Sequence, residues 1–324
     1  HPRAVGLIET REESGSNDLE HYLKKNAARF GSPRLVCVLD SGAGNYEQLW
    51  LTSSLRGACA IDLNVRVLRQ GMHSGTASGV VPSSFDVLRI LLDRIQDPRT
   101  GAILDPAFNV EIPSNRMDDL KKTAEVLGDG FISEFPWAEG PNGSVQSRCR
   151  GTEEALIARC WKPTLSVTGA AGLPPLSMAG NSLRSDTTLR LSFRLPPTAK
   201  TENILPALQK KLLTDPPFNA VVSIAGGDAL PGWNAPSEAD WFRSACDESS
   251  KALWGKPSKR IGEGGSIPIL NLFEAQFPRA QFAVTGVLGP GSNAHNADES
   301  LDLAYTEKFI AAVGYLAASI PEEA

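Results

Sequence analysis

The chain has 324 residues, of which 41% are hydrophobic and 21% charged, with a formal net charge of −5. This is the composition of a globular protein with one or two domains, and the weak charge gives no reason to expect a nucleic-acid partner. The sequence has neither an apolar run of about 20 residues nor a polybasic block, so we expect no membrane partner. Five scattered cysteines without a CxxC motif suggest a reduced, cytoplasmic protein.

The first 56 residues have the pattern of an α/β fold. The apolar run at 4–9 predicts a buried strand, residues 17–30 predict an amphipathic helix, and residues 34–40 predict a second buried strand. A strand, a helix and a strand with short connections form a βαβ unit. This unit predicts a mostly parallel sheet.

Beyond residue 57 the pattern changes to α+β. Strands are expected at 58–68, 164–169, 187–195 and 219–226, where apolar residues are alternating or grouped. Helices are expected at 80–97 and 201–215, with another at 117–127 inside a long irregular stretch. This order predicts a split βαβ, ferredoxin-like sandwich, in which helices cover one face of a single sheet.

The α/β pattern returns near the C-terminus. Residues 228–236, rich in Pro, Gly and Trp, predict a linker. After it we expect a strand at 280–289 and helices at 238–255, 266–276 and 302–320. The domains predicted are therefore a discontinuous α/β domain, residues 1–56 and 235–324, and an α+β domain inserted at 57–234.

Acidic residues and a histidine follow the expected strands of the α/β domain. Glu12 and Glu13 follow the first strand, Asp40 ends the second, and the loop after the strand at 280–289 contains His295. In an open α/β sheet, ligands bind at the carboxyl ends of the strands. Adjacent carboxylates repel each other unless a cation compensates them, and Glu, Asp and His together suit zinc or manganese. One glutamate can then bind metal while its neighbour moves the proton of a water.

A second interpretation of the same residues stays open. The helix dipole favours Asp and Glu in a solvated first turn, so Glu12 and Glu13 need no metal to explain them. A histidine in a loop rich in Gly and Asn, such as His295, also needs no function. The spacing by itself does not decide between the two interpretations.

Several longer motifs occur in order along the whole chain: "EESGS", "VLD", "HSGTASGVVPSS", "WKPTLSVTG", "LSFRLPP", "EGGSIP" and "NAHNADES". Together they resemble the di-zinc aminoacylase and dipeptidase superfamily, and within it the carnosinase-like cytosolic non-specific dipeptidases. The resemblance implies an α/β catalytic domain with an inserted α+β, ferredoxin-like lid and dimerisation domain. It also implies two divalent metal ions, Zn or Mn, and a homodimer formed through the inserted domain.

The resemblance further implies roles for single residues. Metal would be bound by Glu13, Asp40 and His295, and Glu12 would be the general base. His73, on the inserted domain, would stabilise the oxyanion in the active site of the other subunit.

The implied substrate contacts are more scattered. They are Arg194 for the substrate carboxylate, with Asn181, Ser266 and, for a substrate amine, Glu263. Ordinary roles remain open for them, since Arg194 could be an exposed strand arginine and Asn181 and Ser266 could be turn or cap residues.

Two motifs of the superfamily do not occur in this sequence. They are an upstream His-x-Asp and an Asp that bridges the two metals. The chain carries three of the five ligands that the resemblance implies: Glu13, Asp40 and His295. We therefore expect a fragment of a functional enzyme that lacks the first strands of its catalytic domain. By itself it should hold metal poorly and be inactive.

The function predicted is metal-dependent hydrolysis of dipeptides or similar small amides that have a free carboxylate. A related alternative is a deacylase of N-acyl amino acids, of the acetylornithine or succinyl-diaminopimelate type. The long stretch before "WKPTLSVTG" favours the dipeptidase. An alternative of a different class is a non-catalytic dimeric module that binds peptides.

Overall fold

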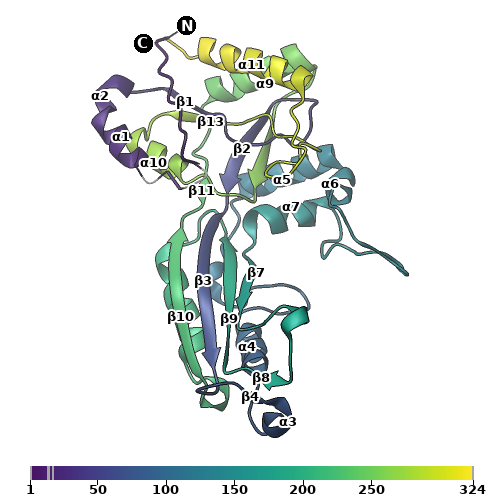
Figure 1. Ribbon diagram of the computed structural model, residues 1–324. Helices are drawn as coiled ribbons and strands as arrows, with labels where there is room; N and C mark the ends of the chain where they lie inside the picture. The colour runs from purple at the N-terminus through teal and green to yellow at the C-terminus, as the bar shows by residue number, and fades with distance from the viewer. Residues whose placement is uncertain (1, 13–14, 17, 323–324) are drawn as a thin grey trace. The chain divides into compact units, whose positions relative to one another are not determined.

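The structure, a computed structural model, describes residues 2–12, 15–16 and 18–322. The chain forms two compact units (Figure 1). Unit 1 consists of His1–Leu55, Ile112–Cys160 and Trp233–Ala324, and unit 2 of Arg56–Glu111 and Trp161–Gly232.

Unit 2 is built on one antiparallel sheet with the strand order β10-β3-β9-β7. Its strands are β3 (Gly57–Arg66), β7 (Thr164–Ala171), β9 (Asp186–Leu195) and β10 (Val221–Leu230). Helix α4 (Ser84–Asp93) lies between β3 and β7 along the chain, and α8 (Ile204–Leu213) lies between β9 and β10. This order of elements is the split βαβ arrangement that the sequence predicts.

Residue alternation along β9 decides which face of this sheet is buried. The side chains on one face are at most 5% exposed: Leu189, Leu191, Phe193 and Leu195. They pack with apolar residues of α4 and α8, among them Leu88 and Leu208. On the opposite face, Arg190 forms a two-pronged ion pair with Asp62 of β3, at 2.7 and 2.8 Å.

The remaining elements of unit 2 are short. They are β4 (Met72–His73), α3 (Ser74–Ala77), η2 (Pro106–Phe108), η3 (Leu176–Met178), β8 (Ser182–Leu183), η4 (Thr201–Asn203) and η5 (Pro217–Asn219). Strands β4 and β8 pair with each other and not with the main sheet.

In the described part of unit 1, two small sheets take the place of the single, mostly parallel sheet that we predicted. β1 (Leu35–Val38) and β13 (Gln281–Val284) pair in parallel. The second sheet is mixed: β2 (Trp50–Leu55) is parallel to β12 (Lys259–Glu263) and antiparallel to β11 (Trp233–Asn234). Hydroxyl groups join the two sheets, since Thr285 Oγ1 donates to Trp50 O at 2.6 Å and the Ser41 and Thr52 hydroxyls lie 2.5 Å apart.

Helices surround these sheets: α1 (Leu19–Lys25), α2 (Ala27–Phe30), α5 (Ser114–Leu127), α6 (Gly130–Ser133), α7 (Thr152–Trp161), α9 (Asp240–Trp254), α10 (Ile269–Gln276) and α11 (Leu303–Ala318). A two-stranded hairpin, β5 (Glu139–Gly140) with β6 (Gly143–Ser144), lies between α6 and α7. Helices α9 and α11 run side by side (Figure 1), and their Phe242 and Tyr305 pack with Trp50 of β2 in one core. Across the described residues, every helix is too short or too polar to traverse a lipid bilayer.

Three local predictions were wrong. Residues 34–40 are not a buried strand, since none of the residues of β1 is fully buried and Leu39 is 55% exposed. Residues 4–9 do not form a buried strand, and Ile8 is 89% exposed. An apolar run becomes a strand only if another strand pairs with it, and none of the described strands does so here. The expected linker at 228–236 instead contains the end of β10 and all of β11, and Trp233 is only 2% exposed.

The structure also differs from the predicted domain boundaries, because Ile112–Cys160 belongs to unit 1. Buried contacts of α5 explain this. Thr123 Oγ1 donates to Arg260 O at 2.6 Å, and Arg116 Nη2 donates to Ala235 O at 2.6 Å. Sequence order places α5 between elements of unit 2, whereas its hydrogen bonds fix it to β12 and to the segment after β11.

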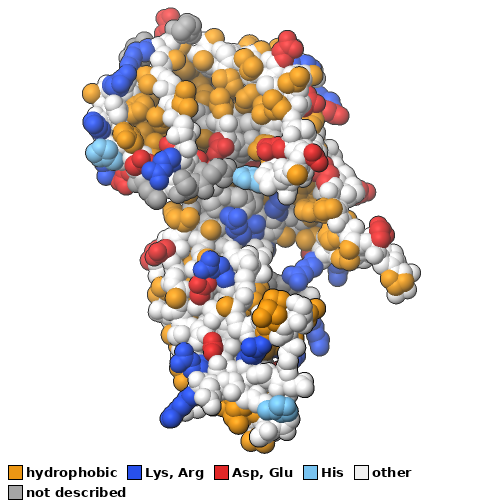
Figure 2. Space-filling model, viewed as in Figure 1, with side chains coloured by type: hydrophobic (Ala, Val, Ile, Leu, Met, Phe, Trp, Pro, Cys, Tyr) orange, Lys and Arg blue, Asp and Glu red, His pale blue; other side chains and the backbone are white. Residues whose placement is uncertain are grey.

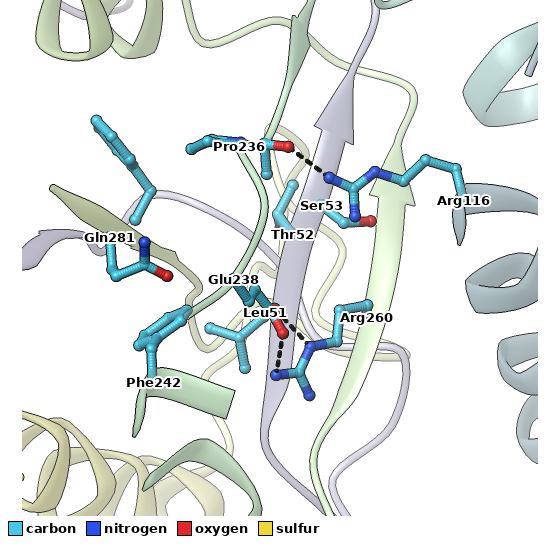
Figure 3. A pocket seen from close by; sticks show the side chains of 11 residues that line it. Leu51, Thr52, Ser53, Arg116, Pro236, Glu238, Phe242, Arg260 and Gln281 are labelled. Atoms are coloured by element: carbon cyan, nitrogen blue, oxygen red, sulfur yellow. Dashed lines mark hydrogen bonds and ion pairs between the residues drawn. The ribbon is translucent and has the colours of Figure 1, made fainter. Parts of the chain in front are cut away.

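Figure 3 shows the small cavity beside these contacts, with Arg116 and Arg260 on its wall. Arg260 is 6% exposed, and it donates to both carboxylate oxygens of Glu238 at 2.8 and 2.9 Å. Loss of one partner from such a buried pair costs about 3–5 kcal/mol, so the pair fixes the segment after β11 against β12. Of the predicted site residues that the structure describes, none lines this cavity.

Candidate active site

The carboxyl ends of β1 and β13 lie next to each other in unit 1. The strands are parallel and in register, with Val38 opposite Val284. The loops after them stay together, because Ser41 N donates to Thr285 O at 3.2 Å and Ala43 N donates to Leu288 O at 2.7 Å. The loop with Asp40 and the loop with His295 therefore begin at the same sheet edge.

A glycine allows these two loops to approach. A Cβ atom on Gly286 would lie 1.7 Å from Ser41 O and 2.8 Å from Ser41 N, far inside van der Waals contact. Any larger residue would have to move the main chain of Ser41, the neighbour of Asp40. Gly286 therefore shapes the site because it has no side chain, although it supplies no functional group.

The end of β12 reaches the same place. A Cβ atom on Gly42 would lie 3.5 Å from Glu263 Oε1 and 2.9 Å from Leu288 O. Asp40, two residues earlier, is exposed. The loop after β1, the end of β12 and the loop after β13 thus meet in unit 1, as the edge rule for α/β sheets predicts.

The loop with His295 has a strained backbone. His295, Asn293 and Asp298 have φ values of +61°, +55° and +63°, the left-handed region that side chains disfavour. A hydrogen bond from Ser300 N to Ser292 O, at 2.9 Å, closes the loop. Backbone strain of this kind concentrates at binding and catalytic sites. The histidine side chain is exposed.

Glu12 lies in a tight turn after the N-terminal segment. Gly15 N donates to Glu12 O at 2.8 Å, and Ser16 N donates to Arg11 O at 3.0 Å. The Glu12 residue is half-buried. Glu13, the predicted metal ligand beside it, lies outside the described residues.

The donor types suit a divalent cation, since a carboxylate at Asp40 and an imidazole at His295 are ligands that zinc and manganese accept. Within the described residues, no group of three His, Cys, Asp or Glu side chains is arranged to hold a metal ion. The third predicted ligand is Glu13. The residues present therefore fit the metal by their chemistry, while the described part of the chain does not complete the set of ligands.

In unit 2, His73 and Asn181 lie together on the pair formed by β4 and β8. His73 is opposite Ser182, and Ser74 N donates to Asn181 O at 2.9 Å. His73 Nδ1 accepts a hydrogen bond from Gly75 N at 3.1 Å. In the neutral imidazole the proton is then on Nε2, which is free of this bond and can donate to an oxyanion.

The last two predicted contacts lie in different units. Arg194 is half-buried in β9 of unit 2, opposite Ala58 of β3 and Thr164 of β7. Ser266 is half-buried in the segment between β12 and α10 of unit 1.

Glu263, expected near a substrate amine, forms an ion pair in the structure. Its Oε2 lies 3.2 Å from Arg159 Nη2, and the two side chains are 22% and 31% exposed. Nothing in the sequence signals Arg159, which sits at the end of an ordinary amphipathic helix more than 100 residues away.

Comparisons with known proteins show which proteins the chain is similar to. No family model matches the chain. It is 24% identical over 304 residues to a cysteinylglycine-S-conjugate dipeptidase of Corynebacterium striatum, with 91% of this chain and 62% of that protein aligned. It is 26% identical over 306 residues to a Cys-Gly metallodipeptidase of Schizosaccharomyces pombe, with 91% and 61% aligned. The chain is related to the carnosinase-like metallodipeptidases.

Solved structures agree on the fold of this metallodipeptidase relative. A dipeptidase of Saccharomyces cerevisiae superimposes with a TM-score of 0.76 at 22% identity, covering 97% of this chain and 65% of that one. Human carnosine dipeptidase 1 gives a TM-score of 0.72 at 19% identity, with 96% and 66% covered. The chain thus spans about three fifths of the length of the curated relatives it matches.

Proposed function

We propose that this protein hydrolyses dipeptides, or similar small amides with a free carboxylate, with the help of divalent metal ions. The observation that carries the proposal is the meeting of the loop with Asp40, the loop with His295 and the end of β12 at one sheet edge. Similarity over about nine tenths of the chain to proteins named Cys-Gly and Beta-Ala-His dipeptidases supports it.

Each predicted residue has a role in this proposal. Two ions, zinc or manganese, would be held with ligands that include Glu13, Asp40 and His295. When bound, such ions polarise a carbonyl oxygen and make water more acidic. Glu12 takes the proton of the attacking water and returns it to the leaving amine.

Four further residues would hold the substrate or the oxyanion. His73 Nε2–H donates to the oxyanion as it forms. A fixed donor at this point stabilises the charge that develops in the transition state. Arg194 pairs with the substrate carboxylate, for which a guanidinium offers two parallel hydrogen bonds. Asn181 and Ser266 add polar contacts to the peptide.

We also propose that unit 2 is the lid and dimerisation domain. His73 is exposed, as a residue that acts in the site of a second subunit must be. Apolar side chains are exposed on the same unit, with Val80 at 83%, Leu176 at 94% and Met178 at 75%. Figure 2 shows such side chains gathered over α3 and over the η3 segment, and exposed apolar groups of this kind are typical of protein contacts.

Light scattering on the full-length protein tests the dimer. We expect a dimer at micromolar concentration, and we expect Leu176→Ser combined with Met178→Ser to give monomers. Ile310→Ser is the matched control, because Ile310 is 67% exposed on unit 1. A monomeric wild-type protein, or a double variant as dimeric as the control, contradicts the proposal.

A side-by-side assay tests the reaction. The full-length protein, supplied with zinc or manganese, should cleave Ala-Gly-type dipeptides faster than N-acetyl amino acids, and a chelator should remove the activity. Faster cleavage of the N-acetyl substrates would identify a deacylase instead. Binding of dipeptide without turnover in either metal would identify a peptide-binding module. The cytoplasmic location stays a prediction from the sequence.

A further inference from the structure

The last turn of α7 holds the end of β12 in place. Arg159 Nη2 donates to Gly262 O at 3.4 Å and to Glu263 Oε2 at 3.2 Å. Cys160 Sγ donates to the same carbonyl oxygen, Gly262 O, at 2.9 Å. Two consecutive helix residues therefore bind one peptide unit and the side chain that follows it.

The peptide unit that they bind is an irregularity in the sheet. The register between β12 and β2 shifts between Ile261 and Gly262. A Cβ atom on Gly262 would lie 2.7 Å from Ser54 Oγ and 2.8 Å from Cys160 Cβ, so the shift is packed tightly on both sides. Such bulges turn the next side chain to a new direction.

The side chain turned in this way is Glu263. Its Oε1 lies 3.5 Å from the Cβ position of Gly42, in the loop that follows Asp40. The chain then continues through Gly264 and Gly265 to Ser266. Glu263 thus lies beside the loop that follows Asp40, near the start of the segment 262–266.

Arg159 is itself held on a fixed surface. Its guanidinium lies 4.8 Å from the centre of the Phe131 ring, a cation–π contact with a side chain that is only 8% exposed. Burial lowers the pKa of Arg159, but Glu263, Cys160 and Glu134 together outweigh it and leave the pKa above its ordinary value. An arginine side chain stays protonated in proteins, so the guanidinium is charged.

We propose that Arg159 is a positioning residue, which acts through Glu263 to hold the segment 262–266 at the candidate site. The inference rests on the proposed function only for its effect on catalysis. Among the described residues, Arg159 is the partner in the one ion pair that Glu263 forms, so removal of the guanidinium leaves this carboxylate uncompensated. A carboxylate without a partner is costly in a partly desolvated place, so Glu263 turns toward water and the segment loses its anchor.

Hydrogen exchange on the full-length protein tests the anchor without any need for activity. In Arg159→Met, we expect amides of residues 262–266 to exchange about ten-fold faster or more, because the segment opens locally. Arg159→Lys keeps the charge but not the forked geometry of the guanidinium. Its exchange rates at residues 262–266 should therefore lie between those of the wild-type protein and those of Arg159→Met. Arg243→Met is the matched control, since Arg243 pairs with Glu238 through a side chain that is 57% exposed.

Kinetics then separate a positioning role from a general loss of stability. We expect Arg159→Met to raise KM for a dipeptide about ten-fold while kcat falls much less, because Ser266 contacts substrate and not the reacting atoms. Because Arg159 acts through Glu263, the double variant Arg159→Met with Glu263→Gln should be no worse than Arg159→Met alone.

The outcomes distinguish this inference from the proposed function. If the wild-type protein cleaves no dipeptide, the proposed function fails, and the exchange experiment still decides on Arg159. Unchanged exchange at 262–266 in a folded Arg159→Met overturns the inference. If Arg159→Met does not fold, Arg159→Lys and Glu263→Gln carry the same expectation of faster exchange, and normal protection in both overturns it.

Discussion

Glu12→Gln in the full-length protein is expected to lower kcat for dipeptides by about 10²–10⁴-fold, the usual contribution of a general base. Glutamine keeps the shape of the side chain but cannot take a proton from water. Since Glu12 is not among the predicted metal ligands, bound metal should stay at the wild-type level. Steady-state kinetics and elemental analysis of the same preparation measure both quantities.

Glu9→Gln is the matched control for this prediction. Glu9 lies in the same segment, and its Oε1 accepts from Arg11 N at 2.7 Å, a bond that glutamine can still accept. The control should keep wild-type kcat and metal. Full activity in Glu12→Gln removes the proposed mechanism. Loss of metal together with activity would instead make Glu12 a ligand.

Gly286→Ala is expected to destabilise unit 1 and to remove activity. The new methyl group would lie 1.7 Å from Ser41 O, so the main chain must move and no side-chain rotation can relieve the clash. Overpacking typically lowers the free energy of unfolding by about 1–3 kcal/mol. Because the main chain cannot relax as a side chain can, we expect a loss at the upper end of this range or above it. Denaturant unfolding should show this loss, together with weaker metal binding, because Asp40 precedes the residue that moves.

A glycine with open surroundings provides the control. Gly314 lies within α11 and a Cβ atom there would meet nothing within 4 Å. Gly314→Ala should stabilise the protein by about 0.5–1 kcal/mol, since alanine favours a helix over glycine. Equal stability of Gly286→Ala and the wild-type protein would mean that the loops after β1 and β13 are not packed as described.

The sequence predicts best where side-chain periodicity reports burial directly. The strict alternation of β9 predicts both the strand and its buried face, and α4 and α8 follow from their apolar spacing. The sheet order β10-β3-β9-β7 follows because few arrangements accommodate this order of strands and helices.

Strands β2 and β12 were missed because their buried groups are polar. β2 is buried along its whole length although half of it is Ser and Thr, and β12 begins with Lys259 and Arg260. The pattern of apolar and polar residues along the sequence predicts that such Ser, Thr, Lys and Arg side chains are exposed. Their partners, Ile261 O for Ser53 and Glu238 for Arg260, come from distant parts of the chain.

The candidate site divides in the same way. Asp40, His295 and Glu12 could be proposed as site residues because each follows an expected element and belongs to a recognisable motif. Gly286 and Arg159 could not, since their effects depend on distances to Ser41 and Glu263 that no local pattern reports. Whether the predicted residues act together stays a prediction.

The pairing of β1 with β13 has a consequence for synthesis of the chain on the ribosome. Unit 2 has all its strands once residue 230 has emerged, whereas Leu35 of β1 must wait for Gln281. At about 5–20 residues per second, the nascent β1 is without its partner for on the order of 10–50 s. During that interval the apolar residues of β1 depend on chaperones or on transient contacts, while the later-starting unit folds first.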